Sequence, residues 1–459
     1  MKKSEVSRRE FLKWGGVALA SAKLVGTTFT PGYGATDTVP ALKGVRRSVV
    51  IPTHEHFGDI DERLDFPGSW ELNVIEMAGH DAPVFGREEI QQRLQKPIGS
   101  RPLREIAAGK KTAVITFDDL TRPTPPASVA PLVVEELKAA GLADENILFM
   151  GSYGAHRNLE VDEVVRKLGI DLVRRYPWIN HNAFDNIKDI GTTSFKNRIK
   201  VNQTFLAADI KITISGIKVH EIAGYGGGGK AILPGVAWID SIEYNHQVIG
   251  RNNKTAGTIK TFKNEVRLDM NEAARLAGVD FSVQIVYNGK RQVCGIFAGD
   301  IVEAHHAACR VANAHYRTRI APTADIVVAN AYPQNTQGTR SVQWIGRSVR
   351  EGGSGVLVLQ HPQGLSAWHF LNQRIGGAKG RTYFDILMSP PPVPAKGMQL
   401  IVYSQYIDKQ QVNKFPRGTR FAQTWAEAVE YLLQRHKGDA RVAIYPYAGI
   451  QHPEIDLDV

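Results

Sequence analysis

Residues 112–150 read TAVITFDDLTRPTPPASVAPLVVEELKAAGLADENILFM and contain one strand–helix–strand unit. The apolar runs at 112–117 and 146–150 have the length of strands, and the apolar spacing within 129–142 predicts a helix between them. Strands that alternate with helices in this way are typical of a mainly parallel sheet. This stretch therefore predicts an α/β fold.

The same alternation extends along the rest of the chain. Further elements are predicted as a helix at 161–168, strands at 209–215, 324–331, 354–360, 398–404 and 441–445, and a helix at 424–436. Because the alternation restarts after residue 315, we expect two α/β domains with mainly parallel sheets. The N-terminal domain would span 36–315 and the C-terminal domain 316–459. The active site is expected in the cleft between them.

The composition indicates a globular enzyme. The chain has 459 residues and a formal net charge of +10, and residues 1–35 contain six Lys or Arg and two Glu, which leaves about +6 for the remainder. This mild excess suits a small anionic substrate, but it is too diffuse for nucleic acid. Two cysteines, Cys294 and Cys309, could pair in an oxidising compartment, but they are too few for a disulfide scaffold, so we expect free thiols.

The N-terminus has the form of an export signal. Residues 7–13 read SRREFLK, the pattern of a twin-arginine signal, and the apolar stretch at 14–30 is too short and too weakly apolar to form a stable membrane span. Small residues at Gly34 and Ala35 suit signal cleavage. The alternative is an amphipathic helix. We expect residues 1–35 to be a signal peptide and the protein to be periplasmic, exported in the folded state by the twin-arginine translocation machinery.

A second informative stretch, residues 220–246, reads HEIAGYGGGGKAILPGVAWIDSIEYNH. His220 precedes Lys230 by ten residues and His246 follows it by sixteen, with Gly224 and Gly226–Gly229 between the first two. Glycines let a backbone approach a ligand closely, and consecutive amides can cradle an anion. A lysine beside such a loop can bind phosphate or act as a nucleophile.

A phosphate-binding P-loop is the simplest alternative for this stretch. The spacing from Gly224 to Gly229 and Lys230 satisfies the first part of that motif. Ala231 follows, however, where the motif needs a hydroxyl side chain for Mg²⁺. The strand predicted at 209–215 also ends well before the glycines. We therefore disfavour a nucleoside triphosphatase.

Two more motifs follow predicted strands. Asp119 and Arg122 lie in DDLTRPTP after the first strand, and His156 lies in GSYGAHR after the second. Gln337 and Arg340 follow the strand at 324–331. The carboxyl ends of strands are the usual location of ligands in open α/β sheets.

Together these motifs resemble the lactate racemase family, whose members use a nickel-pincer nucleotide. The resemblance implies that Lys230 is covalently attached to this cofactor and that His246 ligates nickel. It implies that His156 and His220 are the two catalytic bases. Asp119 would lie beside the cofactor, and the glycines of the loop, Gly226, Gly227, Gly228 and Gly229, would help to bind it.

The family also implies a substrate site. Arg122 would bind the substrate carboxylate, with Gln337 and Arg340 nearby. The family places a lysine where Arg340 stands, and arginine binds carboxylate bidentately whereas lysine is a point charge, so this departure concerns substrate identity. We found no confident match for a C-terminal tryptophan of the family, for which Trp368 is a candidate.

The resemblance therefore predicts an isomerase: a racemase or epimerase that inverts C2 of a small anionic, lactate-like 2-hydroxy acid. In the family, a hydride moves from C2 to the cofactor and back, while two histidines serve the two enantiomers. Enzymes of cofactor biosynthesis would be partners. The alternatives are a sugar-acid (aldonate) C2 epimerase and a periplasmic hydroxy-acid-binding protein that keeps the fold without catalysis.

Other histidines have simpler interpretations. His54-Glu55-His56 resembles the first-strand motif of metal-dependent amidohydrolases, but no convincing series of later ligands follows it. His305 and His306 lie in a predicted helix, where we expect them to be partly exposed.

Overall fold

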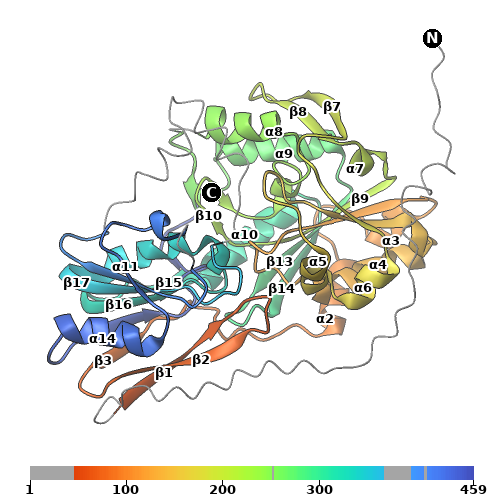
Figure 1. Cartoon of the computed structure of the whole chain (residues 1–459). Coiled ribbons are helices and arrows are strands. Elements are labelled where there is room, and N and C mark those ends of the chain that lie inside the picture. The colour runs from red at the N-terminus through yellow and green to blue at the C-terminus, as the bar shows by residue number, and fades with distance from the viewer. Residues whose placement is uncertain (1–45, 251–252, 366–393, 408–410) are drawn as a thin grey trace. The chain divides into compact units, whose positions relative to one another are not determined.

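The first of two six-stranded sheets contains the strand–helix–strand unit of residues 112–150. The computed structural model describes residues 46–250, 253–365, 394–407 and 411–459 (Figure 1). The strand order is β14-β13-β9-β4-β5-β6, and every neighbouring pair is parallel except β13 and β14. Its strands are β4 (Ala113–Phe117), β5 (Ile147–Gly151), β6 (Trp178–Asn180), β9 (Ile210–Gly216), β13 (Phe281–Tyr287) and β14 (Val293–Gly299).

The second sheet is parallel throughout, in the order β19-β18-β17-β16-β20-β3. Its strands are β3 (Glu71–Val74), β16 (Ala324–Asn330), β17 (Val349–Val358), β18 (Gln399–Tyr403), β19 (Arg420–Ala422) and β20 (Arg441–Tyr445). Four two- or three-stranded sheets complete the β structure: β1 (Arg46–Thr53) with β2 (Ile60–Pro67), β7 (Ile187–Thr192) with β8 (Arg198–Asn202), β10 (Val219–His220) with β11 (Ala223–Tyr225) and β12 (Gly257–Thr258), and β15 (Arg317–Thr318) with β21 (His452–Pro453).

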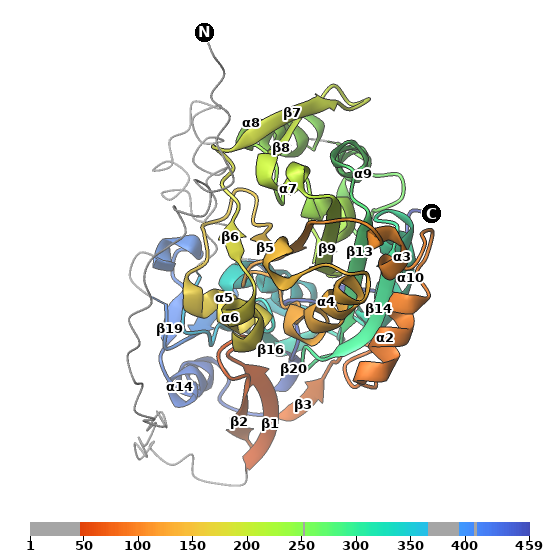
Figure 2. The same cartoon turned by 90° about the vertical axis from the view of Figure 1, so that its right-hand side faces the viewer.

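Helices connect the strands and cover the sheets (Figures 1 and 2). The α-helices are α2 (Arg87–Gln95), α3 (Leu103–Ala107), α4 (Ala130–Ala139), α5 (Val161–Leu168), α6 (Ile170–Arg175), α7 (Gln203–Ala207), α8 (Ile239–Glu243), α9 (Glu265–Ala277), α10 (Glu303–His315), α11 (Val342–Ser348) and α14 (Trp425–Arg435). Shorter turns are η1 (Pro126–Ser128), η2 (Asp144–Asn146), η3 (Gly228–Ala231), η5 (Asn335–Ser341) and η6 (Gln411–Lys414), and the π-helical turn η4 (Tyr244–Ile249).

Both faces of the central strands are buried, as expected for a parallel sheet covered by helices. In β4, Ile115 and Phe117 belong to one apolar cluster, to which α4 contributes, whereas Val114 belongs to another, to which α9 contributes. In β16, Ile326 and Val327 face different clusters in the same way. All five residues of β4 are buried, which explains why every residue except Thr116 is apolar.

The main strands and helices predicted from the sequence are confirmed. The helix predicted at 161–168 coincides with α5, and the strand predicted at 441–445 coincides with β20. The α/β class with mainly parallel sheets is confirmed as well. The division into domains and the cleft between them stay predictions, and the proposed signal at 1–35 lies outside the described residues.

One strand assignment could not have been foreseen. β3 lies early in the chain, yet it pairs with β20 at the edge of the second sheet. The pairing joins residues more than three hundred positions apart, and although ELNV alternates polar and apolar residues, four residues are too few to specify a partner.

Candidate active site

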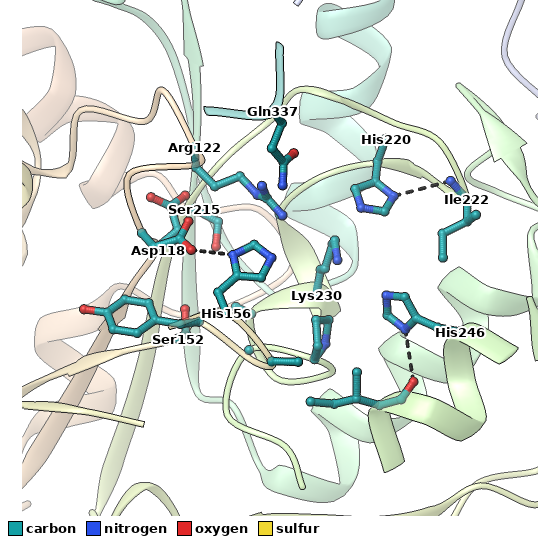
Figure 3. A pocket seen from close by; sticks show the side chains of 18 of the residues that line it. Asp118, Arg122, Ser152, His156, Ser215, His220, Ile222, Lys230, His246 and Gln337 are labelled. Atoms are coloured by element: carbon teal, nitrogen blue, oxygen red, sulfur yellow. Dashed lines mark hydrogen bonds and ion pairs between the residues drawn. The ribbon is translucent and has the colours of Figure 1, made fainter. Parts of the chain in front are cut away.

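A pocket with a volume of about 290 Å³ lies at the carboxyl ends of the central strands. β4 leads directly to Asp119 and Arg122, β5 leads to His156, and β9 leads through β10 to His220. Because parallel strands end at one edge of their sheet, three segments distant in sequence converge there. Figure 3 shows their side chains around one space.

The pocket brings together most of the residues predicted from the sequence. Those that line it are Asp119, Arg122, His156, His220, Gly227, Lys230, His246, Gln337 and Arg340. Gly226, Gly228 and Gly229 are buried but are not among its lining residues. Their proposed part in cofactor binding stays a prediction.

Asp119 and His156 form a close pair. Nδ1 of His156 lies 2.5 Å from Oδ2 of Asp119, and Thr121 donates to Oδ1 through its backbone N–H (3.1 Å) and its hydroxyl (2.6 Å). The carboxylate is 4% exposed. Although burial opposes ionisation, His156 and Arg122 hold the pKa of Asp119 far below its ordinary value. The charged carboxylate keeps the proton of the neutral imidazole on Nδ1, so Nε2 is the basic nitrogen.

Burial lowers the pKa of His156, and Asp119 acts in the opposite direction. His220 is also buried, and its Nδ1 accepts from the backbone N–H groups of Ile222 (3.4 Å) and Ala223 (3.3 Å). Burial, together with the charge of Lys230, holds the pKa of His220 well below its ordinary value. Both imidazoles are therefore neutral near pH 7, the charge state from which a proton can be accepted. His156 presents Nε2 as its basic nitrogen, whereas His220 does so only after its two long Nδ1 contacts break and its ring proton moves to Nδ1.

The lowered pKa values predict the pH profile of any reaction in which these histidines act as bases. The value of kcat/KM should be constant from pH 8 down past about 6.5, the ordinary pKa of histidine, and should fall only at lower pH. Because Asp119 raises the pKa of His156, Asp119→Asn should lower both the plateau and the pH of the acid limb. A pH–rate series checks this; an acid limb that moves to higher pH in the variant would contradict the assignment.

Lys230 lies in η3, at the end of the glycine loop, and is 9% exposed. Burial and the neighbouring Arg122 hold the pKa of its amine well below the ordinary value. A lowered pKa raises the fraction of the amine that is neutral, and the neutral form is the nucleophile. Figure 3 shows Lys230 in the middle of the site, with His156, His220 and His246 around it.

His246 lies in the π-helical turn η4. Its Nδ1 donates to the carbonyl oxygen of Ile242 at 3.1 Å, so the lone pair is on Nε2. Burial, aided by the charge of Lys230, lowers the pKa of His246 to about 3. A neutral imidazole whose second nitrogen is held by a carbonyl oxygen is the usual form of a metal-ligating histidine.

A buried arginine, which was not predicted from the sequence, donates hydrogen bonds to the backbone of the glycine loop. Arg267 on α9 is fully buried and donates to the carbonyl oxygens of Ala223, Tyr225 and Gly227. Burial lowers its pKa to about 10. No local signal marked this residue, because an arginine in an amphipathic helix normally faces solvent.

The expectation for His305 was wrong. This residue is fully buried, and its Nε2 donates to the carbonyl oxygen of Gly226 at 2.8 Å. A Cβ added at Gly228 would lie only 2.6 Å from Cγ of the His305 ring, so the ring packs directly against this glycine. The contact with the loop explains the burial, and helical periodicity alone could not show it. His306 is partly exposed, as expected.

Gly224 gives a direct test of loop packing. It has a φ of +73°, and a Cβ there would lie 2.1 Å from the carbonyl oxygen of Lys260. Gly278 at the end of α9 has a similar φ of +68° but open space around it. We expect Gly278→Ala to cost about 1 kcal/mol in unfolding free energy and Gly224→Ala about 1–3 kcal/mol more, from the added overlap. Chemical denaturation measures both; equal losses would show that the loop relaxes freely.

The second sheet contributes Gln337 and Arg340 through η5, which follows β16. Arg340 forms an ion pair with Glu221 (Nε–Oε1 3.0 Å), an acid that lines the pocket and was not singled out from the sequence. The only sequence feature that could have indicated Glu221 is its position directly after His220. Gln337 accepts from Gln334 Nε2 at 2.7 Å.

A second acidic residue that lines the pocket, Asp118, forms an ion pair with a lysine of the protein. Asp118 accepts a 2.7 Å bond from the fully buried amine of Lys167. The cations Arg122 and Arg340 therefore face the pocket without an excess of negative charge from this carboxylate. Such an arrangement suits a small carboxylate ligand.

Within the described ranges, no group of three or more His, Cys, Asp and Glu side chains is arranged to hold a metal ion, and no helix combines the length and apolar character that crossing a membrane requires. Cys294 and Cys309 are both free. Trp368 lies outside the described residues.

The fold and pocket define an α/β protein whose pocket contains a buried lysine and three histidines. Residues 57–257 match the sequence model of the lactate racemase N-terminal domain. The chain is 29% identical over 298 residues to a lactate racemase of Thermoanaerobacterium thermosaccharolyticum, covering 64% of this chain and 67% of that protein. It is 27% identical over 394 residues to one of Lactiplantibacillus plantarum, covering 81% and 92%.

Solved structures share the fold. The lactate racemase apoprotein from T. thermosaccharolyticum superposes with a TM-score of 0.65 at 22% identity, covering 88% of this chain and all of that chain. A protein of Thermotoga maritima gives 0.59 at 18% identity, covering 82% and 99%. The sequence matches support assignment to the lactate racemase family, and similarity to these isomerases supports the prediction that this chain is an isomerase.

Proposed function

We propose that the protein is a racemase or epimerase of 2-hydroxy acids that uses a nickel-pincer nucleotide attached to Lys230. The observation that carries the proposal is the single pocket in which His156, His220, Lys230 and His246 meet Arg122. Similarity to lactate racemases supports the reaction class.

The residues present fit such a cofactor. Lys230 offers a buried amine whose lowered pKa suits covalent attachment, and His246 offers Nε2 as a nitrogen ligand, a donor that suits nickel. The adjoining glycine loop supplies backbone amides that can approach an anion. When bound, the nickel-pincer nucleotide supplies a reversible hydride acceptor for C2 of the substrate.

The protein's own groups bind the acid and move its proton. Arg122 and Arg340 are placed to hold the substrate carboxylate, with Gln337 beside them, while the configuration at C2 changes. His156 accepts the hydroxyl proton of one enantiomer and His220 that of the other, because an inverted centre presents its hydroxyl to the opposite side. Asp119 orients His156 and stabilises its protonated form.

The proposal includes the cellular context. Enzymes of cofactor biosynthesis build and attach the cofactor in the cytoplasm, and the twin-arginine machinery then exports the folded protein to the periplasm. Residues 1–35, which carry Arg8 and Arg9, support this part of the proposal. They lie outside the described residues.

The test is a panel of enantiopure 2-hydroxy acids and aldonates incubated with the purified, cofactor-loaded protein in D₂O. We expect inversion of at least one acid without deuterium at C2, because the hydrogen that leaves C2 is the one that returns. Deuterium at C2 would indicate enolisation and overturn the hydride scheme. Binding without inversion of any acid would favour the non-catalytic alternative.

A further inference from the structure

The turn between β1 and β2 contains the His54-Glu55-His56 motif, which the pocket does not include. Three of its residues that are not glycine have positive φ: His54 (61°), His56 (66°) and Asp59 (40°). Residues with a Cβ rarely adopt this conformation. It persists only where the surrounding contacts over-determine it.

On one side, the turn holds the backbone of Arg122. Nδ1 of His56 accepts from Nη2 of Arg291 at 2.9 Å, so its Nε2 carries the proton and donates to the carbonyl oxygen of Arg122 at 3.1 Å. Arg291 also donates to the carbonyl oxygen of Pro123 (3.2 Å), and its Nη1 contacts both carboxylate oxygens of Asp59 (2.6 and 2.7 Å). The substrate-binding arginine is therefore fixed through its main chain.

On the other side, the turn holds the start of η5. Glu55 is fully buried, and its carboxyl oxygens lie 2.6 Å from the backbone N–H and 2.5 Å from the side-chain amide of Asn335. Asp59 accepts a 2.7 Å bond from the hydroxyl of Tyr332 just before this segment. η5 carries Gln337 and Arg340 into the pocket.

Two adjacent side chains of one strained turn thus hold the two segments that supply the substrate-binding cations. The Arg122 segment follows a strand of the first sheet, and η5 follows a strand of the second. We infer that the turn at 54–59 is a positioning element that sets the distance between Arg122 and Arg340 and so determines how the substrate carboxylate is held. The role of the two arginines in substrate binding rests on the proposed function. The contacts by which the turn positions them do not depend on it.

Glu55 is the position to test, because the structure offers a conservative replacement. Asn335 Oδ1 is buried and has no hydrogen-bond partner. After rotation of the Asn335 amide, a glutamine at 55 can accept from the backbone N–H and donate to this oxygen. Glu55→Gln should therefore keep the link, whereas Glu55→Ala breaks it. Glu136→Ala is a matched control, since Glu136 is a buried glutamate of α4 paired with Arg104.

The first measurement is steady-state racemisation by cofactor-loaded enzyme. We expect Glu55→Ala to raise KM about tenfold to a hundredfold, the range that a small misplacement of binding groups produces, with unchanged cofactor mass on Lys230. Glu55→Gln should restore KM, and Glu136→Ala should leave it unchanged. An unchanged KM in folded Glu55→Ala would overturn the inference. Should Glu55→Ala fail to fold, Tyr332→Phe removes one bond to the turn and should raise KM less; an unchanged KM there would count equally against it.

The second measurement does not depend on activity. Hydrogen–deuterium exchange should become faster in Glu55→Ala at both 119–124 and 334–341, but not in Glu136→Ala. Unchanged exchange at 119–124 would show that the two segments are not linked through the turn. If the parent enzyme racemises nothing, the proposed function fails, while the exchange data still decide the positioning role.

Discussion

Replacing Lys230 with alanine is expected to abolish racemisation and to leave the polypeptide without covalently attached cofactor. The reason is chemical: the amine is buried among cations, and its lowered pKa raises the fraction that is in the neutral, nucleophilic form. No other lysine lines the described pocket. Intact-mass spectrometry of protein from a host that makes the cofactor, combined with a racemisation assay, measures both effects.

Lys290→Ala is the control, since Lys290 is exposed and lies away from the pocket lining. It should keep both the added mass and the activity. Circular dichroism checks that the Lys230 variant remains folded. A Lys230→Ala protein that retained cofactor mass and full activity would contradict the attachment site.

The second large effect is expected at the two histidines. His156→Ala and His220→Ala should each lower kcat/KM about 10²–10⁴-fold, the usual contribution of a general base. Because two enantiomers have equal free energy, kcat/KM must fall equally in both directions, even though each imidazole serves one enantiomer. Steady-state assays in both directions test this, and His80→Ala near the surface, where His80 contacts Glu76, should have no effect.

A single-turnover experiment then separates the two roles. Keto-acid formation from one enantiomer should be lost in His156→Ala and kept in His220→Ala, and the opposite should hold for the other enantiomer. Unchanged rates in both variants would remove the two-base scheme. Loss of both half-reactions in each variant would instead indicate that the histidines act together on every substrate.

Local sequence features predicted much of this site because they depend on short-range structure. Apolar runs followed by polar motifs placed Asp119 and His156 after neighbouring strands, and parallel pairing of β4 with β5 brings those ends together. The resemblance of residues 220–246 to the lactate racemase family predicted that His220, Lys230 and His246 meet in one pocket. Their catalytic and binding roles stay predictions.

The features that were missed depend on long-range contacts. Arg267 interacts with carbonyl oxygens about forty residues earlier in the chain, and Glu55 contacts Asn335 across 280 positions. Backbone carbonyl and N–H groups leave no mark in a sequence, so neither contact could be recognised. The same holds for His305, whose burial follows from one bond to the glycine loop.

The central claim is that Lys230 holds a nickel cofactor whose metal is ligated by His246. Peptide mapping by mass spectrometry, with nickel analysis of the same active preparation, tests it most directly. We predict a covalent adduct on the peptide that contains Lys230, stoichiometric nickel in the parent, and loss of nickel in His246→Ala. An unmodified, nickel-free chain that still interconverts enantiomers would contradict the account.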